Sequence, residues 1–240
     1  MGRWWSLFAA AGASAVLAGC GGSSSPGVST GAARSTASPT VGRPITDEEA
    51  LQLARVLNRN YEDGGAMFSG TLPFPRGTTV KVTGRIDWRH LRGQATFVDP
   101  VAKLSDRVYW TKTAVFEQTG PSGVAARTFN RHPPQPKTRV IDFYISALAR
   151  TSSETIDNIT TIKEQGTTFL RTDRLGVDAV NVFRYGSAGK ARYWLDTSGL
   201  LRRIELDLQS LSGTAVLSFF KRGPTVIALP PITKTAIASR

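Results

Sequence analysis

The sequence contains one cysteine, Cys20, and two histidines, His90 and His132, among 240 residues. A single cysteine excludes an intramolecular disulfide, and a structural zinc site needs about four ligands, mostly Cys and His. The chain also has no Gly-x-Ser-x-Gly and no His-Glu-x-x-His motif, which are typical of serine hydrolases and zinc proteases. A catalytic triad assembled from distant residues stays open as an alternative. We therefore expect a protein that is not an enzyme and that holds no cofactor or metal.

Charged residues are almost missing from the N-terminal stretch, residues 1–19. Arg3 is its one charge, and an apolar run ending in small residues follows, which is the pattern of a secretory signal. A membrane span needs about 20 predominantly apolar residues. The sixteen from Trp4 to Gly19 include two serines and two glycines, which favours a signal over a permanent span.

The motif LAGC at 17–20 ends this run and resembles the lipobox of bacterial lipoproteins. The resemblance implies that the Cys20 sulfur carries a diacylglyceryl group and that residues 1–19 are removed as a signal peptide. Two acyl chains anchor a protein stably in a membrane, whereas one chain anchors it only marginally, since each buried methylene contributes roughly 0.8 kcal/mol. We expect lipid anchoring at Cys20 on the extracytoplasmic face of the cell membrane. The alternative is an ordinary signal peptide that happens to contain a cysteine.

Large apolar residues are scarce again between the cysteine and residue 44. Gly, Ser, Thr, Ala and Pro dominate residues 21–44, and the segment contains no aromatic residue. Such a composition predicts a disordered tether over 20–44, with a typical reach of roughly 25–30 Å. The remaining stretch, residues 45–235, has the length of one domain and contains no second linker of this kind.

Basic residues outnumber acidic residues in this chain. Without residues 1–19 the chain has 29 Lys and Arg against 18 Asp and Glu, a net charge of +11. Outside the cytoplasm, the acidic partners are anionic lipid head groups or anionic wall polymers rather than nucleic acid. No run of five or six basic residues occurs, so the simpler interpretation is a solvated surface with a positive bias.

The pattern along residues 45–235 predicts two helices separated by strands. Thr46 and Glu49 form a capping box for a helix that ends at Gly64 and Gly65, and residues 138–152 predict the second helix. Residues 78–88 alternate between apolar and polar and pair as a hairpin with residues 93–98. A further hairpin turns at 196–199. The order helix, four or five strands, helix, four or five strands predicts an α+β fold: a large curled antiparallel sheet, a half-open β-barrel of about 9–11 strands, covered by two or more helices.

Two short motifs resemble those of the actinobacterial LppX/LprG-type lipoproteins. These are the hairpin sequence YWLDTSG at 193–199 and the strand GRIDW at 84–88. The resemblance extends over most of residues 46–231 and implies the fold of the LolA/LolB lipoprotein carriers, a half-open barrel with helices in its mouth. It also implies binding of acyl chains or lipidated molecules inside the barrel. It implies no strict ligand-binding motif. Strands such as 109–117 alternate poorly between apolar and polar residues, so a smaller cavity, or no cavity, is an alternative.

Large apolar side chains on the predicted strands and the second helix are the candidates for lining a cavity. Each of them is also an ordinary core residue, because core and cavity lie on the same face of a half-barrel. The candidates are Val82, Ile86, Trp88, Trp110, Phe116, Phe143, Phe183, Ile204 and Leu206.

We therefore expect a membrane-anchored lipoprotein that binds or carries a lipid or another hydrophobic ligand. Two alternatives remain open at this point. One is an envelope regulator that binds a protein partner through its basic surface. The other is a structural protein that holds an anionic wall polymer by its charge.

Overall fold

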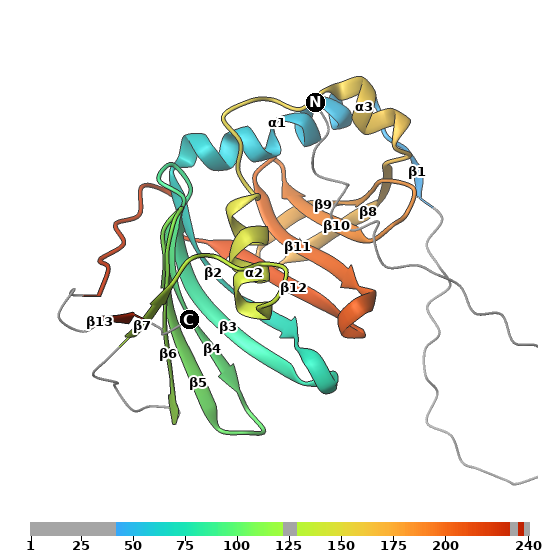
Figure 1. Ribbon diagram of the computed structural model, residues 1–240. Helices are drawn as coiled ribbons and strands as arrows, with labels where there is room; N and C mark the ends of the chain where they lie inside the picture. The colour runs from blue at the N-terminus through green and yellow to red at the C-terminus, as the bar shows by residue number, and fades with distance from the viewer. Residues whose placement is uncertain (1–41, 122–128, 231–234, 238–240) are drawn as a thin grey trace, which may run out of the picture. The chain divides into compact units, whose positions relative to one another are not determined.

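The computed structural model describes residues 42–121, 129–230 and 235–237, and Figure 1 shows their arrangement. Thirteen strands, three α-helices and two short 3-10 turns are present in these residues. The strands are β1 (Arg43–Pro44), β2 (Gly65–Pro73), β3 (Thr79–Asp87), β4 (Arg92–Asp99), β5 (Leu104–Trp110), β6 (Val115–Pro121), β7 (Phe129–His132), β8 (Thr168–Leu175), β9 (Asp178–Tyr185), β10 (Ala191–Asp196), β11 (Leu201–Leu208), β12 (Gly213–Phe220) and β13 (Thr235–Ile237). The helices are α1 (Asp47–Asp63), α2 (Val140–Ala149) and α3 (Ile159–Glu164), and the 3-10 turns are η2 (Pro75–Gly77) and η3 (Gln209–Leu211).

All thirteen strands belong to one sheet, in the order β1-β8-β9-β10-β11-β12-β2-β3-β4-β5-β6-β7-β13. Neighbours are antiparallel except β13, which pairs in parallel with β7. The end strands β1 and β13 do not pair with each other in the described residues, so the sheet is not closed into a barrel. The predicted α+β class with a large curled antiparallel sheet is confirmed at this level.

The predicted number of strands, 9–11, is too low, because the additional strands are very short. β1 has two residues and β13 has three, too few to show an alternating pattern. β1 consists of Arg43 and Pro44, which the composition assigned to the tether but which pair with β8. The predicted signal peptide and residues 20–41 of the predicted tether, Cys20 included, lie outside the described residues.

The two ends of the sheet differ and are called the α1 end and the open end. At the α1 end, helix α1 crosses the sheet above the β3–β4 and β10–β11 turns (Figure 1). The open end carries the β2–β3 turn with η2, the β4–β5 turn, and the β11–β12 turn with η3. Strand pairing places the first two turns side by side, and η2 contacts η3. Helix α2 lies between the two halves of the curled sheet, on its concave side (Figure 1).

Helix α1 forms as the sequence predicts. The Thr46 side chain accepts a hydrogen bond from the Glu49 backbone N–H at 3.2 Å, and the Glu49 carboxylate accepts one from the Thr46 backbone N–H at 2.9 Å. This is the predicted capping box. Gly64 ends the helix with a φ of 85°, a left-handed conformation that favours glycine.

The concave face of the sheet is packed with aromatic side chains over glycines. Phe68 on β2 pairs with Gly84 on β3, and Gly93 on β4 pairs with Trp110 on β5. A Cβ atom on Gly93 would lie only 2.1 Å from the Trp110 ring. These glycines therefore let large rings lie flat on the neighbouring strands, and both rings are at most 1% exposed.

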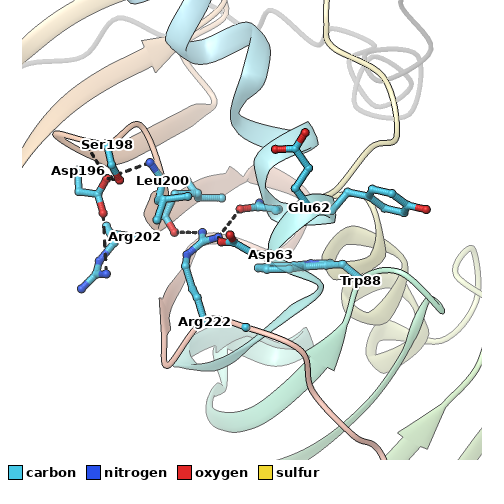
Figure 2. Close-up of polar contacts among 12 residues, drawn as sticks. Glu62, Asp63, Trp88, Asp196, Ser198, Leu200, Arg202 and Arg222 are labelled. Carbon is cyan, nitrogen blue, oxygen red and sulfur yellow. Dashed lines mark hydrogen bonds and ion pairs between the residues drawn. The ribbon is translucent and has the colours of Figure 1, made fainter.

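A hydrogen-bond network closes the α1 end (Figure 2). The Arg222 guanidinium donates to Asn60 Oδ1 and to Asp63 Oδ2, both at 2.8 Å, and to the Leu201 carbonyl. It also lies over the Trp88 ring, 5.3 Å from the ring centroid. Burial lowers the pKa of Arg222 while the ion pair with Asp63 raises it, and an arginine stays charged in either case.

The same network reaches helix α2. Trp88 Nε1 donates to Thr151 Oγ1 at 3.0 Å, and that hydroxyl donates to the Leu148 carbonyl at 2.6 Å. The Asn60 side-chain amide donates to the Thr151 carbonyl at 2.5 Å. Helix α1, the end of α2 and the segment after β12 are therefore joined through buried polar groups.

Candidate ligand-binding site

Six of the nine predicted cavity residues are core residues in this structure. Each is at most 3% exposed, so no water-sized space lies beside its side chain. These six are Val82, Ile86, Trp88, Trp110, Phe183 and Ile204. The concave face is therefore packed at these positions, and none of them lines an open cavity while α2 is in place.

Phe116 lies on the opposite face of the sheet from the six core candidates. Phe116 pairs with Tyr109, and both alternate with the inward-facing Trp110 and Val115. Side chains of successive strand residues point to opposite faces. The Phe116 ring thus lies on the convex face of the sheet, and the inward position beside it belongs to Glu117. The poor alternation of this strand is the reason that the sequence did not show it.

The other two candidates, Leu206 and Phe143, are half-buried. Leu206 pairs with Ala215 and Ala191 on the concave face. Phe143 lies on the first turns of α2 and contacts Tyr144 edge-on, with 5.3 Å between ring centroids. Of the nine candidates, Phe143 lies in a groove at the open end.

This groove has a volume of about 220 Å³ and runs between the start of α2 and η3. Its apolar part consists of Val140, Phe143 and Leu211, and Pro136 closes one side. Its remaining lining residues are polar or cationic: Lys137, Thr138, Arg139 and Ser210. Arg139 is paired with Glu117, so Lys137 is the lining cation available to a ligand. Apolar side chains beside one such cation match an amphiphile that carries a negative charge.

Aromatic rings gather around Tyr144, the residue that follows Phe143 on α2. Phe74 stacks on Tyr144 with 5.8 Å between centroids and meets Phe97 at 6.5 Å. The Tyr144 hydroxyl donates to the Pro73 carbonyl, which ties α2 to the β2–β3 turn. Burial raises the pKa of Tyr144, so the hydroxyl stays protonated and can keep donating.

A cluster of ionisable side chains lies at the first turn of α2 and is here called the His132 cluster: Glu117, His132, Arg139 and Asp142. Arg139 pairs with Glu117, and the Gln135 backbone N–H donates to Asp142 Oδ2 at 2.7 Å. His132 lies between the two carboxylates, with Nε2 3.5 Å from Glu117 and Nδ1 3.6 Å from Asp142. Both distances exceed those of ordinary hydrogen bonds.

The His132 cluster is only partly satisfied. His132 Nε2, Arg139 Nε and Asp142 Oδ1 are buried and make no hydrogen bond to the rest of the described chain. Buried polar groups without partners cost free energy, so this cluster holds α2 less firmly than a complete network would. Nowhere in the described ranges do three or more His, Cys, Asp or Glu side chains lie in position to hold a metal ion.

The groove joins residues that the sequence could not connect. Residues 136–143 and 210–211 are about seventy positions apart, and Lys137, Val140 and Leu211 carry no motif. They meet because α2 crosses the concave side and brings its first turn to the β11–β12 turn. Only the apolar character of the second helix, through Phe143, pointed to this place.

Two further findings bear on function. None of the helices in the described residues is long and apolar enough to cross a membrane. The sequence matches no protein-family model, and no curated protein is significantly similar to it. The function is therefore argued from the groove and its surroundings.

Proposed function

We propose that the protein is a lipoprotein of the extracytoplasmic membrane face, anchored through Cys20, that binds a lipid or other amphiphilic ligand at the groove between α2 and η3. The proposal rests on one observation, the combination of apolar side chains with the unpaired cation Lys137 in the lining of that groove, at the open end of a curled sheet. The protein binds its ligand and does not transform it.

The groove suggests how such a ligand would lie. An acyl chain or another apolar group would cover Val140, Phe143 and Leu211, which are half-buried and already face apolar neighbours. A negatively charged head group would meet Lys137, which forms no ion pair with any described residue. A volume of about 220 Å³ lies below the roughly 300–1,000 Å³ usual for drug-sized ligands. The groove would thus take one end of a ligand.

Helix α2 would act as the cover of the remaining concave face. Its side chains Ile141, Tyr144, Ile145 and Leu148 are at most 6% exposed, and the helix lies on the concave side of the sheet (Figure 1). A longer acyl chain could enter there only if the first turns of α2 moved away. The incomplete hydrogen bonding of the His132 cluster supports loosening at that end of the helix.

The first test is mass spectrometry of organic extracts from the full chain. The C20S variant should be expressed in an actinobacterial host and purified without detergent, so that no covalent acyl chain contributes. We expect a co-purifying amphiphile at a stoichiometric level. L211W, which fills the groove, should reduce it at least tenfold, whereas V177W, an equal change at a 93% exposed valine, should not.

A titration with cis-parinaric acid, a fluorescent fatty acid, tests the same site in vitro. The C20S chain should bind the probe, L211W should abolish binding, and K137Q should weaken it about fivefold through the lost charge. K190Q serves as the control for charge removal. Equal binding by C20S and L211W, together with no extracted lipid, would contradict the proposed function.

A further inference from the structure

The β4–β5 turn at the open end exposes apolar side chains to solvent. Val101 is 85% exposed and Leu104 is 44% exposed. The Asp99 carboxylate accepts hydrogen bonds from the backbone N–H groups of Val101 and Ala102 at 2.8 and 2.9 Å, so the turn has a defined conformation. Val101 is therefore held outward at the tip of a narrow hairpin.

Exposed cations lie at the same end of the sheet. Arg76 in the β2–β3 turn, Lys103 in the β4–β5 turn and Lys137 before α2 are all exposed, and none forms an ion pair within the described ranges. Lys81 follows on β3, opposite Val98. The acidic residues closest to these turns are Asp99, which caps its own turn, Asp106 on β5, and the exposed Asp207 on β11, against the four cations Arg76, Lys81, Lys103 and Lys137. Cations are thus in excess at this end.

Two of these cations stand where the backbone disfavours them. Arg76 has a φ of 64° and Lys103 a φ of 54°, in the left-handed region that favours glycine or asparagine. Long side chains at such positions carry a small conformational cost, of order 1 kcal/mol each. The fold therefore presents a cation at the tip of both hairpins.

We propose that the open end docks on a membrane surface that contains anionic lipids. Val101 and Leu104 enter the head-group region, while Arg76, Lys103 and Lys137 meet lipid phosphates. This interaction goes beyond the anchor at Cys20 and the ligand in the groove, and it requires neither of them.

The arrangement fits a membrane better than other anionic partners. Exposed apolar side chains flanked by cations are typical of surfaces that lie in the membrane interface. A linear anionic polymer would use the cations and leave Val101 and Leu104 in water. A protein partner needs a continuous patch of about 800 Å² on each side, whereas these residues occupy separate narrow turns. Docking in this way also places the groove beside the lipid surface.

Vesicle sedimentation with the full-length C20S chain tests the proposal without the anchor. We expect binding to phosphatidylcholine vesicles that contain a quarter phosphatidylglycerol, and little binding to pure phosphatidylcholine. The triple variant R76Q/K103Q/K137Q should bind on the order of a hundredfold more weakly, since each basic residue near such a surface contributes about 1 kcal/mol. V101S/L104S should lose on the order of tenfold through the apolar area left in water.

Matched controls separate this face from net charge alone. R150Q/R174Q/K190Q removes three other cations, and V177S removes an exposed valine in the β8–β9 turn. Both should bind within about twofold of C20S. Because C20S has no cysteine, V101C provides a unique site for an NBD label, whose fluorescence should rise and shift to the blue on anionic vesicles, unlike that of labelled V177C.

Several outcomes would overturn the docking proposal. These are no binding to the anionic vesicles, equal losses in the two triple variants, or an unchanged label at V101C. Binding of the C20S chain that follows cation number alone, with a free polyanion competing fully, would point to a polymer partner. Because Lys137 also lines the groove, L211W, which fills the groove, should bind the anionic vesicles as C20S does. Failure of docking then leaves the proposed function standing, and failure of the parinaric acid titration leaves docking standing.

Discussion

The α1 end and the open end of the sheet differ in how they use their charged residues. At the α1 end, the Arg222 side chain is 8% exposed and donates to three acceptors. At the open end, Arg76, Lys103 and Lys137 are exposed and pair with no carboxylate in the part of the chain that the structure describes. The charge at one end stabilises the fold, and the charge at the other end is available to a partner.

The buried polar groups show the same difference. At the α1 end, the Trp88 indole, the Thr151 hydroxyl and the Asn60 amide have hydrogen-bond partners, and Arg222 Nε is one buried atom of that network without a partner. The His132 cluster, which holds the other end of α2, leaves three buried polar atoms without one. Helix α2 is thus fixed firmly where it meets α1 and less firmly where it meets the groove. This gradient along one helix is what a cover over a ligand site requires.

Replacing Arg222 should have the largest effect. R222M leaves the Asp63 carboxylate, the Asn60 side chain and the Leu201 carbonyl without their donor, and breaking a buried pair in this way costs about 3–5 kcal/mol. Urea unfolding followed by circular dichroism measures the loss. K221M, at the exposed neighbouring residue, is the matched control and should change the free energy of unfolding by less than about 0.5 kcal/mol. A loss below 1 kcal/mol in R222M would contradict the account of the α1 end.

Removing the Asp87 carboxylate should have the next largest effect and should depend on pH. Burial acts to raise the pKa of Asp87, but hydrogen bonds from Arg92 and His90 outweigh it, so its pKa lies below the ordinary value. The resulting stabilisation is present above the unfolded pKa of about 3.9 and is lost as the pH falls through the lower folded pKa.

We therefore expect D87N to lose about 2 kcal/mol of unfolding free energy at pH 7, through its buried hydrogen bonds. The difference from the unmodified chain should shrink as the pH falls below about 4. Urea titrations at pH 7, 5 and 3.5 test this, with D99N at the open end as the control. A difference that stays constant over this pH range would show that the carboxylate charge does not matter.

Removing one hydroxyl tests the link between α1 and α2. T151V leaves Trp88 Nε1 buried without an acceptor, which costs about 1–3 kcal/mol. T151S keeps the hydroxyl and should restore most of the stability, since only a methyl group is lost. Thermal unfolding of both variants beside T83V, an exposed strand position, gives the comparison. Equal losses in T151V and T151S would assign the effect to packing instead.

The α1 end was largely predictable from sequence because its signals are local. Thr46 and Glu49 are three residues apart and form the predicted capping box, and the turn at Asp196 forms as predicted, with Gly199 at a φ of 77°. Such features depend on backbone chemistry within a few residues. The Arg222 network was not predictable, since its partners lie about 160 positions away and no pattern marks them.

The open end was hardly predictable, for two physical reasons. Large apolar side chains on strands identify the buried face, but burial does not tell core from cavity, and six of the nine candidates are packed core. Phe116 also points to the convex face, because Glu117 takes the inward position in a strand of irregular pattern. The groove depends on where α2 begins relative to η3, which is set by the fold as a whole.

The smallest effect on stability is expected at the open end, and this result would sharpen the comparison most. V101S/L104S and R76Q/K103Q/K137Q change exposed side chains that make no ion pair with described residues, so each should alter the free energy of unfolding by less than about 0.5 kcal/mol. The same variants should lose most of their binding to anionic vesicles. Replacing Arg76 and Lys103 by glycine should even stabilise the fold by some tenths of a kcal/mol, because both have a positive φ. If these variants unfolded as readily as R222M, the cations would be part of the fold and not a surface kept free for a partner.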